Sequence, residues 1–251
     1  MADSAAVIRV GIGGWTYAPW RGAFYPEGLP HDHELAYASA SLTSIEINGT
    51  FYRHQSPESF ASWRRGTPDS FVFAVKAHMA TTHGRDPAAA GPAIARFLAS
   101  GIEELGPKLG PILWQFPPAK RFDPAAFQAF LSALPPTLNG QRLHHAVEAR
   151  HSSFEDSAWP ALARAHNVAV VIIDSDKQAL HCDLTADFVY ARLQRNDAAA
   201  PEGYDAGALD DWAARVRDWA SVPDPRPCFV YFISGDKQRA PDAATAFLRR
   251  L

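Results

Sequence analysis

The sequence has few cysteines and no long apolar segment, and these absences exclude several classes of protein. Its two cysteines, Cys182 and Cys228, lack the spacing of metal ligands, so neither a disulfide framework nor a cysteine zinc site is expected. No apolar run approaches the ~18 residues of a membrane-spanning helix. Residues 1–4 lack the charged and apolar regions of a secretory signal. We therefore expect a cytoplasmic protein without membrane association.

Basic residues do not outnumber acidic ones. Lys and Arg total 24 and Asp and Glu total 27, for a formal net charge of −3, and no dense basic run occurs. A protein that binds nucleic acid through its phosphate backbone is usually more basic. The charge therefore disfavours nucleic acid as a partner and leaves a small molecule as the expected ligand.

What the sequence does have is a large apolar content in a chain of barrel length. Of its 251 residues, 47% are hydrophobic and 12% are aromatic. That is enough apolar mass for a full core, and about 250 residues is the usual size of one α/β barrel. No linker or internal repeat divides the chain, so we expect one domain over residues 1–251.

Short β-rich runs alternate with helical segments. Helices are predicted at 92–105, 124–134 and 209–220, where apolar residues recur every three to four positions. Alternation of strands and helices predicts a parallel sheet, and eight strands at this length predict closure into a TIM-type (β/α)8 barrel. The predicted strands are 7–13, 44–48, 71–77, 111–116, 144–150, 168–174, 188–193 and 228–233.

The sixth βα unit is expected to be irregular. The segment between Asp174 and Phe188 leaves little room for a full helix. An open doubly wound sheet is the alternative fold, but Gly11-Ile12-Gly13-Gly14 lacks the third glycine of the dinucleotide-binding fingerprint. We therefore predict a single barrel with an irregular sixth unit.

Polar side chains interrupt the apolar pattern on one face of the predicted strands. In 44–48, Glu46 and Asn48 share the face opposite the two isoleucines, because successive strand residues point to opposite sides. The outer face of a barrel strand packs under helices, so the polar face is expected inside, near the C-terminal strand ends where barrel enzymes have their active sites. The expected site residues are Glu46, Asn48, Lys76, His78, Gln115, Glu148, Arg150, Asp174, Tyr190 and Arg192, with His83 on the loop after the third strand.

These charged residues are expected to form pairs, because an unpaired charge is costly to bury. One interpretation is a salt-bridge network that only plugs the barrel mouth. We favour a ligand site, since polar groups that converge in a cleft tend to mark function. The expected pairs join Glu46 or Glu148 with Lys76, Arg150 or Arg192.

Three chemistries can use this set of residues. Lys76, if desolvated and beside other cations, can lose its proton and form a Schiff base with a carbonyl substrate. The carboxylates and His78 can instead hold a divalent metal ion, although no spacing indicates one. In the third chemistry, Glu46 or Glu148 is the general base, while Lys76 and the arginines hold an anionic substrate. We favour the third because it needs no cofactor.

Aromatic residues crowd the first two strand-to-helix connections. They either cover the barrel top as a satellite core or form a wall on which a sugar ring or a base stacks. For the wall we select Trp15, Tyr17 and Tyr52. If the ligand is a nucleotide or a nucleic acid, the candidates for a basic rim are Arg53, Arg85, Arg192 and Arg195.

Several long motifs follow one another along most of the chain. They are Gly14-Trp15-Thr16-Tyr17, Glu46-Ile47-Asn48-Gly49-Thr50-Phe51-Tyr52-Arg53, Phe73-Ala74-Val75-Lys76-Ala77, Leu113-Trp114-Gln115-Phe116-Pro117-Pro118, Ala146-Val147-Glu148-Ala149-Arg150-His151 and Tyr190-Ala191-Arg192-Leu193. In this order they resemble the motifs of the DUF72 (YecE-like) family of unknown function. The resemblance implies an eight-stranded TIM-type barrel with a polar C-terminal mouth, and it implies no reaction.

The chain departs from the pattern of this family near its end. Members tend to follow the arginine and leucine of the seventh strand with His-Gly, whereas this chain has Gln194-Arg195. Members tend to carry paired asparagines after the eighth strand, where this chain has Ser234 and Gly235. After the fifth strand they usually have a tryptophan where Phe154 stands in this chain. These alterations allow for a changed substrate or a lost activity.

The residues thus predict a protein that binds a small anionic or sugar-like ligand, bearing phosphate or carboxylate, at the C-terminal barrel mouth. We expect acid–base chemistry of the hydrolase, lyase or isomerase type. The alternatives are a non-catalytic module that binds a nucleotide or nucleic acid, and a degenerate barrel that serves as a scaffold. The sequence specifies neither a cofactor nor an oligomeric state.

Overall fold

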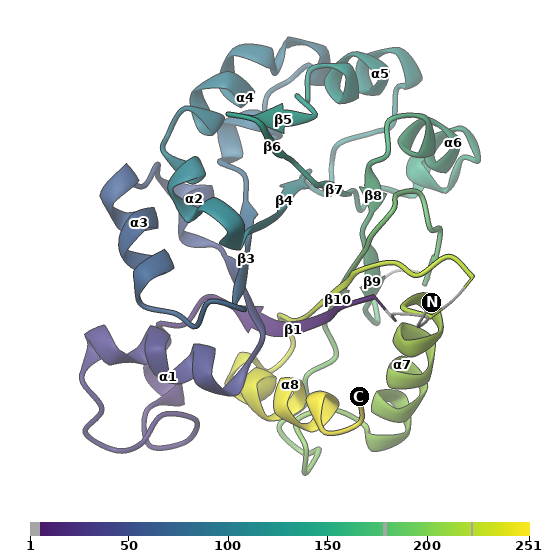
Figure 1. The fold of residues 1–251 in the computed structure, drawn as a ribbon. Helices are drawn as coiled ribbons and strands as arrows, with labels where there is room; N and C mark the ends of the chain where they lie inside the picture. The colour runs from purple at the N-terminus through teal and green to yellow at the C-terminus, as the bar shows by residue number, and fades with distance from the viewer. Residues whose placement is uncertain (1–5, 178–179, 222) are drawn as a thin grey trace.

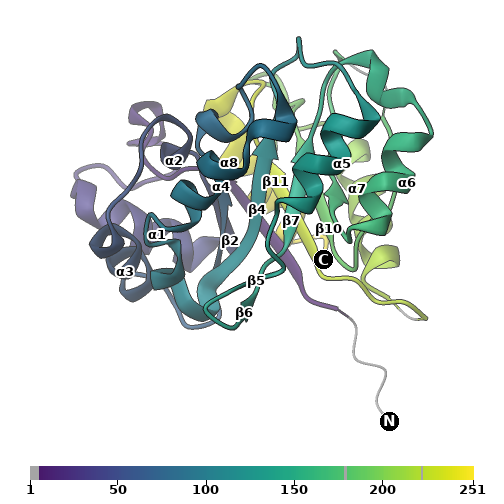
Figure 2. The same ribbon diagram turned by 90° about the horizontal axis from the view of Figure 1, so that it is seen from above.

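Parallel strands form a barrel in the computed structural model, which describes residues 6–177, 180–221 and 223–251 (Figures 1 and 2). The hydrogen-bonded order is β8-β7-β4-β3-β2-β1-β11-β10-β9. This arrangement confirms the predicted fold class. The barrel strands are β1 (Ile8–Gly13), β2 (Ser44–Ile47), β3 (Val72–Lys76), β4 (Leu109–Gln115), β7 (His145–Glu148), β8 (Ala169–Val170), β9 (Ile172–Asp174), β10 (Val189–Leu193) and β11 (Cys228–Phe232).

The sixth barrel position is a broken strand. β8 pairs with β7 and β9 pairs with β10, and between them the amide of Val171 donates to the carbonyl of Val147 at 3.0 Å. The two pieces join the ends of the sheet, so nine strands occupy eight positions. Within the described part of 175–188 no helix occurs, which confirms the irregular sixth unit.

Helices surround the barrel on its outside (Figure 1). Capping side chains define several helix starts, since Ser56, Asp123 and Asp205 each accept a hydrogen bond from a backbone amide three residues later. None of the helices in the described ranges is long and apolar enough to cross a membrane. The α-helices are α1 (Glu34–Ser41), α2 (Gly49–Tyr52), α3 (Pro57–Arg65), α4 (Gly91–Leu98), α5 (Pro124–Ser132), α6 (Ala158–Ala165), α7 (Ala206–Trp219) and α8 (Ala240–Leu248).

Short 3-10 helices and one hairpin complete the connections. The hairpin of β5 (Thr137–Leu138) and β6 (Gln141–Arg142) lies at the end of the barrel where the strands begin (Figure 2). The 3-10 helices are η1 (Ala18–Trp20), η2 (His31–His33), η3 (Met79–Thr81), η4 (Pro87–Ala89), η5 (Ile102–Lys108), η6 (Ser152–Glu155) and η7 (Lys237–Arg239).

The prediction of one continuous helix at 92–105 is wrong. α4 ends at Leu98, and η5 follows after Gly101, whose φ of 102° lies in the left-handed region. A Cβ atom at Gly101 would lie 2.7 Å from Pro57, so the close approach of α3 requires glycine there. This long-range contact overrides the local helical pattern.

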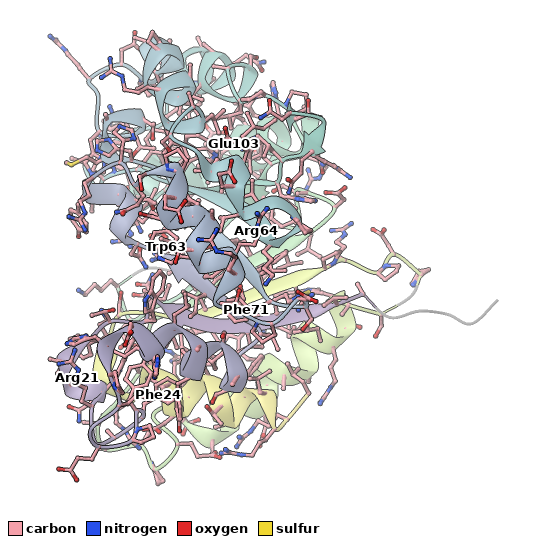
Figure 3. All side chains as sticks on the ribbon, turned by 60° about the vertical axis from the view of Figure 1, so that its left-hand side comes forward. Arg21, Phe24, Trp63, Arg64, Phe71 and Glu103 are labelled. Carbon is pink, nitrogen blue, oxygen red and sulfur yellow. The ribbon has the colours of Figure 1, made fainter. Side chains whose placement is uncertain are left out.

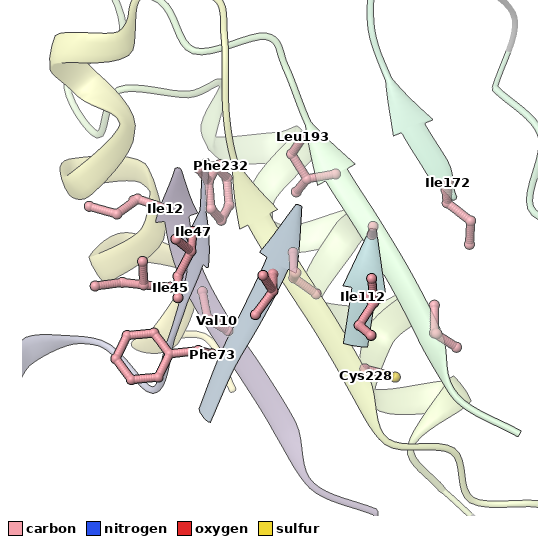
Figure 4. Packing of buried hydrophobic residues seen from close by; sticks show 14 of the residues in the cluster. Val10, Ile12, Ile45, Ile47, Phe73, Ile112, Ile172, Leu193, Cys228 and Phe232 are labelled. Atoms are coloured by element: carbon pink, nitrogen blue, oxygen red, sulfur yellow. The ribbon is translucent and has the colours of Figure 1, made fainter. Parts of the chain in front are cut away.

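Two apolar clusters line the two faces of the barrel wall. Outward residues such as Ile12, Ile45 and Phe73 pack under the helices (Figure 4). Inward residues form a second cluster that includes Tyr190 and Tyr231. Toward the C-terminal strand ends the inward positions become charged, and there the sequence places the expected site.

Candidate functional site

A buried ion cluster occupies the barrel interior just below its C-terminal mouth. The Arg192 guanidinium lies between Glu46 and Glu148, and all three side chains are at most 3% exposed. Its Nε and Nη2 atoms donate to the two carboxylate oxygens of Glu46, each at 3.1 Å, and Nη1 donates to Glu148 Oε2. Alternation along β2, β7 and β10 brings the three residues inside, and the expected pairing of carboxylates with arginine is present.

Further donors complete the coordination of both carboxylates. Tyr190 Oη donates to Glu46 Oε2 at 2.7 Å, and Arg150 Nε donates to Glu148 Oε1 at 2.5 Å. Burial alone would raise the pKa of Glu148, but the Arg192 and Arg150 guanidinium groups outweigh it and hold that pKa below its usual value. Burial and the Glu46 charge raise the pKa of Tyr190, so its hydroxyl stays protonated. The cluster is therefore a fully hydrogen-bonded set of charges.

Lys76 lies at the end of β3 near this cluster and is 8% exposed. Its Nζ donates to Gln115 Oε1 at 2.6 Å and lies 4.0 Å from the centroid of the Phe51 ring. Burial, reinforced by the positive charge of Arg192, lowers the pKa of Lys76 to about 8. A lysine with this pKa exchanges its proton near neutral pH.

A pocket of about 340 Å³ opens above these residues. Four cationic side chains line it, and no carboxylate does so within the described ranges. Asn48 and Tyr52 also line it, so the structure brings together most of the strand residues that the sequence predicts. The lining residues are Gly13, Trp20, Asn48, Tyr52, Lys76, Gln115, Arg150, Arg192, Phe232, Ile233, Ser234, Lys237 and Ala240.

Lys237 is a lining residue that the sequence reasoning missed. Its Nζ lies 4.5 Å from the centroid of the Tyr17 ring and 5.4 Å from that of Trp20. The Trp20 indole also donates to the Lys237 carbonyl at 3.0 Å, which fixes this loop against η1. Partial burial lowers the pKa of Lys237. Its only signal in the sequence is its position a few residues beyond the eighth strand.

Four predicted residues from loops lie outside the lining of this pocket: Trp15, Tyr17, His78 and His83. Trp15 packs against Trp63 at a centroid distance of 5.1 Å, and Trp63 belongs to α3 on the outside of the barrel (Figure 3). His78 stacks on His54 at 4.4 Å, and this neighbour together with burial lowers the pKa of His78. The centroid of the His83 ring lies 5.3 Å from that of Phe51, and Phe51 in turn contacts Lys76.

Asp174 belongs to a separate network behind the barrel wall. It accepts hydrogen bonds from Tyr204 Oη at 2.5 Å and Trp212 Nε1 at 2.8 Å, and it pairs with Arg195. The reason is strand alternation, because Asp174 shares the outward face of Ile172. Asp174 lies two residues after the apolar Ile172, and this spacing in the sequence predicts that both side chains point outward, away from the pocket.

The residues considered for a metal ion are therefore held apart. Glu46 and Glu148 bind Arg192, while Asp174 and His78 contact other partners. Over the ranges that the structure describes, no three side chains of His, Cys, Asp or Glu converge as a metal site.

Removing the Tyr204 hydroxyl tests the role of the Asp174 network. We expect Tyr204→Phe to lower the free energy of unfolding by about 1–2 kcal/mol, because one buried hydrogen bond to a carboxylate is lost while two other partners remain. Urea denaturation measures this change. Ligand binding in the pocket should be unaffected, and a variant that loses binding without losing stability would place Asp174 in the site after all.

The two loops with altered family motifs pack against each other. Asn196 Nδ2 donates to the Ser234 carbonyl at 2.8 Å, and the Asp236 amide donates to the Asn196 carbonyl at 2.7 Å. A Cβ atom at Gly235 would lie 2.5 Å from that same carbonyl oxygen. Ser234 lines the pocket while Arg195 pairs with Asp174, so these two loops form one pocket wall and its support.

Comparison with known proteins gives the family. A family model described as "Protein of unknown function DUF72" matches residues 9–251. The chain belongs to the DUF72 family. Solved DUF72 proteins share the fold over nearly their whole length. One, from Thermotoga maritima, is 26% identical with a TM-score of 0.76, and the alignment covers 97% of this chain and 98% of that one. Another, from Enterococcus faecalis, is 16% identical with a TM-score of 0.71 and 97% coverage of both chains.

The barrel of this DUF72 protein also resembles part of a solved fusion protein. A xylose isomerase-like TIM barrel/4-hydroxyphenylpyruvate dioxygenase fusion protein is 15% identical with a TM-score of 0.53, and the match covers 98% of this chain and 42% of that one. At this identity the likeness shows the fold alone. No curated protein matches the chain.

Proposed function

We propose that this DUF72 protein binds a small anionic or sugar-like ligand, bearing phosphate or carboxylate, at the barrel mouth and acts on it by acid–base chemistry. The observation that carries this proposal is the charge of the pocket. Lys76, Arg150, Arg192 and Lys237 line it, and within the described ranges no carboxylate does. Such a lining favours an anion.

The balance of charge in the cluster supports this proposal. The two buried carboxylates, Glu46 and Glu148, are matched by the two arginines that contact them. Lys76 and Lys237 form no salt bridge with any residue that the structure describes. A ligand that carries negative charge supplies their missing counter-charge.

The proton-transfer role fits Lys76 better than the carboxylates. Glu46 and Glu148 are fully buried behind Arg192 and do not line the pocket, so their proposed role is to hold Arg192 and to tune its neighbours. Lys76 lines the pocket with a pKa of about 8, which suits a general acid or base near neutral pH. Gln115 orients the amine of Lys76 through its hydrogen bond. The proposed chemistry is of the hydrolase, lyase or isomerase type.

Thermal stability in the presence of matched ligands tests the anion site. Ribose 5-phosphate at 100 times its dissociation constant should add about 2.7 kcal/mol of stability, whereas neutral ribose at the same concentration should add none. Lys237→Met should weaken the binding of ribose 5-phosphate about tenfold, because one charge-assisted contact is lost. Lys177→Met, at an exposed lysine outside this pocket, is the control. Equal shifts with ribose and its phosphate would overturn the proposal.

Other outcomes of the same screen support the alternatives. Arg192 is 3% exposed and Arg195 pairs with Asp174, so two of the four arginines considered for a basic rim are engaged within the protein. Stabilisation by an oligonucleotide alone, lost steeply between low and moderate salt, would support a nucleic-acid module. A response to a divalent cation would support a metal cofactor. No response to any ligand would support a scaffold.

We propose a reducing compartment, such as the cytoplasm, as the location. The support is that Cys182 and Cys228 are both free thiols. Burial raises the pKa of Cys228 to about 12, so this thiol stays protonated.

A further inference from the structure

The two buried lysines differ in how their amines are hydrogen-bonded. An ammonium group has three N–H donors. Lys108 Nζ donates to the carbonyls of Arg64 and Thr67, each at 2.7 Å, and to Thr67 Oγ1 at 3.2 Å, so all three donors are used. Lys76 Nζ has one acceptor within the described ranges, the neutral amide oxygen of Gln115. The surroundings of Lys76 therefore stabilise its ammonium form less than those of Lys108 do.

The charged groups around Lys76 come from three elements and act in opposite directions. Arg192 on β10 and Arg150 after β7 disfavour the ammonium form, while Glu46 on β2 and Glu148 favour it. The carboxylates bind the guanidinium groups directly and make no salt bridge to Lys76, so burial and the cations prevail. With a pKa of about 8, a fraction of the Lys76 amine is neutral near neutral pH, and that fraction is a nucleophile at the wall of the anion-binding pocket.

We infer that Lys76 forms an imine with a small aldehyde or ketone that carries an anionic group. This inference rests on the proposed anion-binding function, because Arg150 and Lys237 line the same pocket and would hold the anionic group. The Phe51 ring covers one side of the Lys76 amine. A ligand therefore reaches the amine from the pocket side, with its carbonyl group toward Nζ. The pocket volume of about 340 Å³ suits a ligand of this size.

The step needs no cofactor and balances as written. The lone pair of the neutral Nζ attacks the carbonyl carbon, a C–N bond forms, and the π electrons of the carbonyl move to its oxygen. Both amine protons then pass to that oxygen, the C–O bond breaks, and water leaves from a neutral imine. A proton from solvent converts the imine into an iminium ion, and nothing is oxidised or reduced.

Reductive trapping tests the inference on the full-length protein. The probes are glyoxylate, an anionic aldehyde, and glycolaldehyde, a neutral one of similar size, each with sodium cyanoborohydride at pH 7.5. Peptide mass mapping then locates the secondary amine. With glyoxylate, Lys76 should be modified roughly tenfold or more faster than the exposed Lys177, because more of its amine is neutral. Glycolaldehyde should show a smaller preference for Lys76.

Lys76→Arg is the matched variant, since arginine keeps a positive group but forms no such imine. It should lose modification at position 76, whereas Lys177→Arg, at an exposed lysine outside this pocket, should keep both that modification and the stabilisation by ribose 5-phosphate. If that phosphate stabilises the wild type but glyoxylate modifies Lys76 no faster than Lys177, the inference fails and the anion-binding function stands. If neither stabilisation nor trapping at Lys76 occurs, both fail. Equal trapping by the two aldehydes would overturn the anionic part of the substrate class.

Discussion

Replacing Arg192 by leucine is expected to lower the free energy of unfolding by about 5 kcal/mol, enough to unfold much of the protein. The substitution leaves Glu46 and Glu148 buried at 0% exposure without the guanidinium that both contact. The loss of stability on removing one partner is larger than the net contribution of the intact ion pair, because the remaining carboxylate stays out of contact with water and has lost its counter-charge. Urea denaturation followed by circular dichroism measures the change.

A triple variant separates the effect of charge from that of packing. Arg192→Leu combined with Glu46→Gln and Glu148→Gln removes all three charges, and we expect it to recover most of the lost stability. A triple variant as unstable as Arg192→Leu alone would show that the shape of the arginine, and not its charge, supports the barrel. A single variant as stable as the wild type would contradict the ion cluster itself.

The difference in stability between the wild type and Arg192→Leu depends on pH with a defined sign. The pKa of Glu148 is lowered in the folded state, so its contribution to stability is present above its unfolded pKa and is lost as pH falls through the folded value. Without Arg192, burial favours protonation of the Glu148 carboxylate instead. The gap in stability between the wild type and Arg192→Leu should therefore narrow as the pH falls below about 5.

Strand alternation explains why the buried half of the site could be predicted from the sequence. Glu46, Glu148 and Arg192 lie within strands, where each side chain has one of two directions and the apolar neighbours show which direction is outward. The cost of burying charge then requires them to pair. The barrel fold follows from a different alternation, that of strands with helices along the chain.

Loop residues could not be predicted in this way, because no such parity constrains them. His78 lies beyond the end of β3, where the strand rule no longer applies, and it caps a 3-10 helix instead. Lys237 follows β11 and reaches the pocket only because Tyr17 and Trp20, about 220 residues earlier, contact it. The break at Gly101 likewise depends on the distant Pro57. Contacts between segments far apart in sequence decided the last two of these cases.

Replacing Lys76 by methionine is expected to make the protein more stable than the wild type below pH 8. The folded pKa of Lys76 is about 8, below the value of about 10.4 in an unfolded chain. Below pH 8 both states bind the proton, so the folded state bears the full cost of the buried ammonium, about 3 kcal/mol by linkage. Methionine has no such cost and packs well against an aromatic ring such as Phe51.

The advantage of the methionine variant should shrink as the pH rises from 8 to about 10.4, because the unfolded wild type then binds a proton that the folded state does not. Comparing two proteins at each pH cancels the shared titration of Tyr190 and Tyr231, whose raised pKa values lower stability in alkali. Lys76→Arg stays charged throughout, so its difference from Lys76→Met should stay constant. Urea denaturation of all three proteins between pH 7 and about 10.5 measures these differences. If the difference in unfolding free energy between Lys76→Met and the wild type stayed constant with pH, Lys76 would have the ordinary pKa of a lysine. Both proposed roles of Lys76, in proton transfer and as a nucleophile, would then be contradicted.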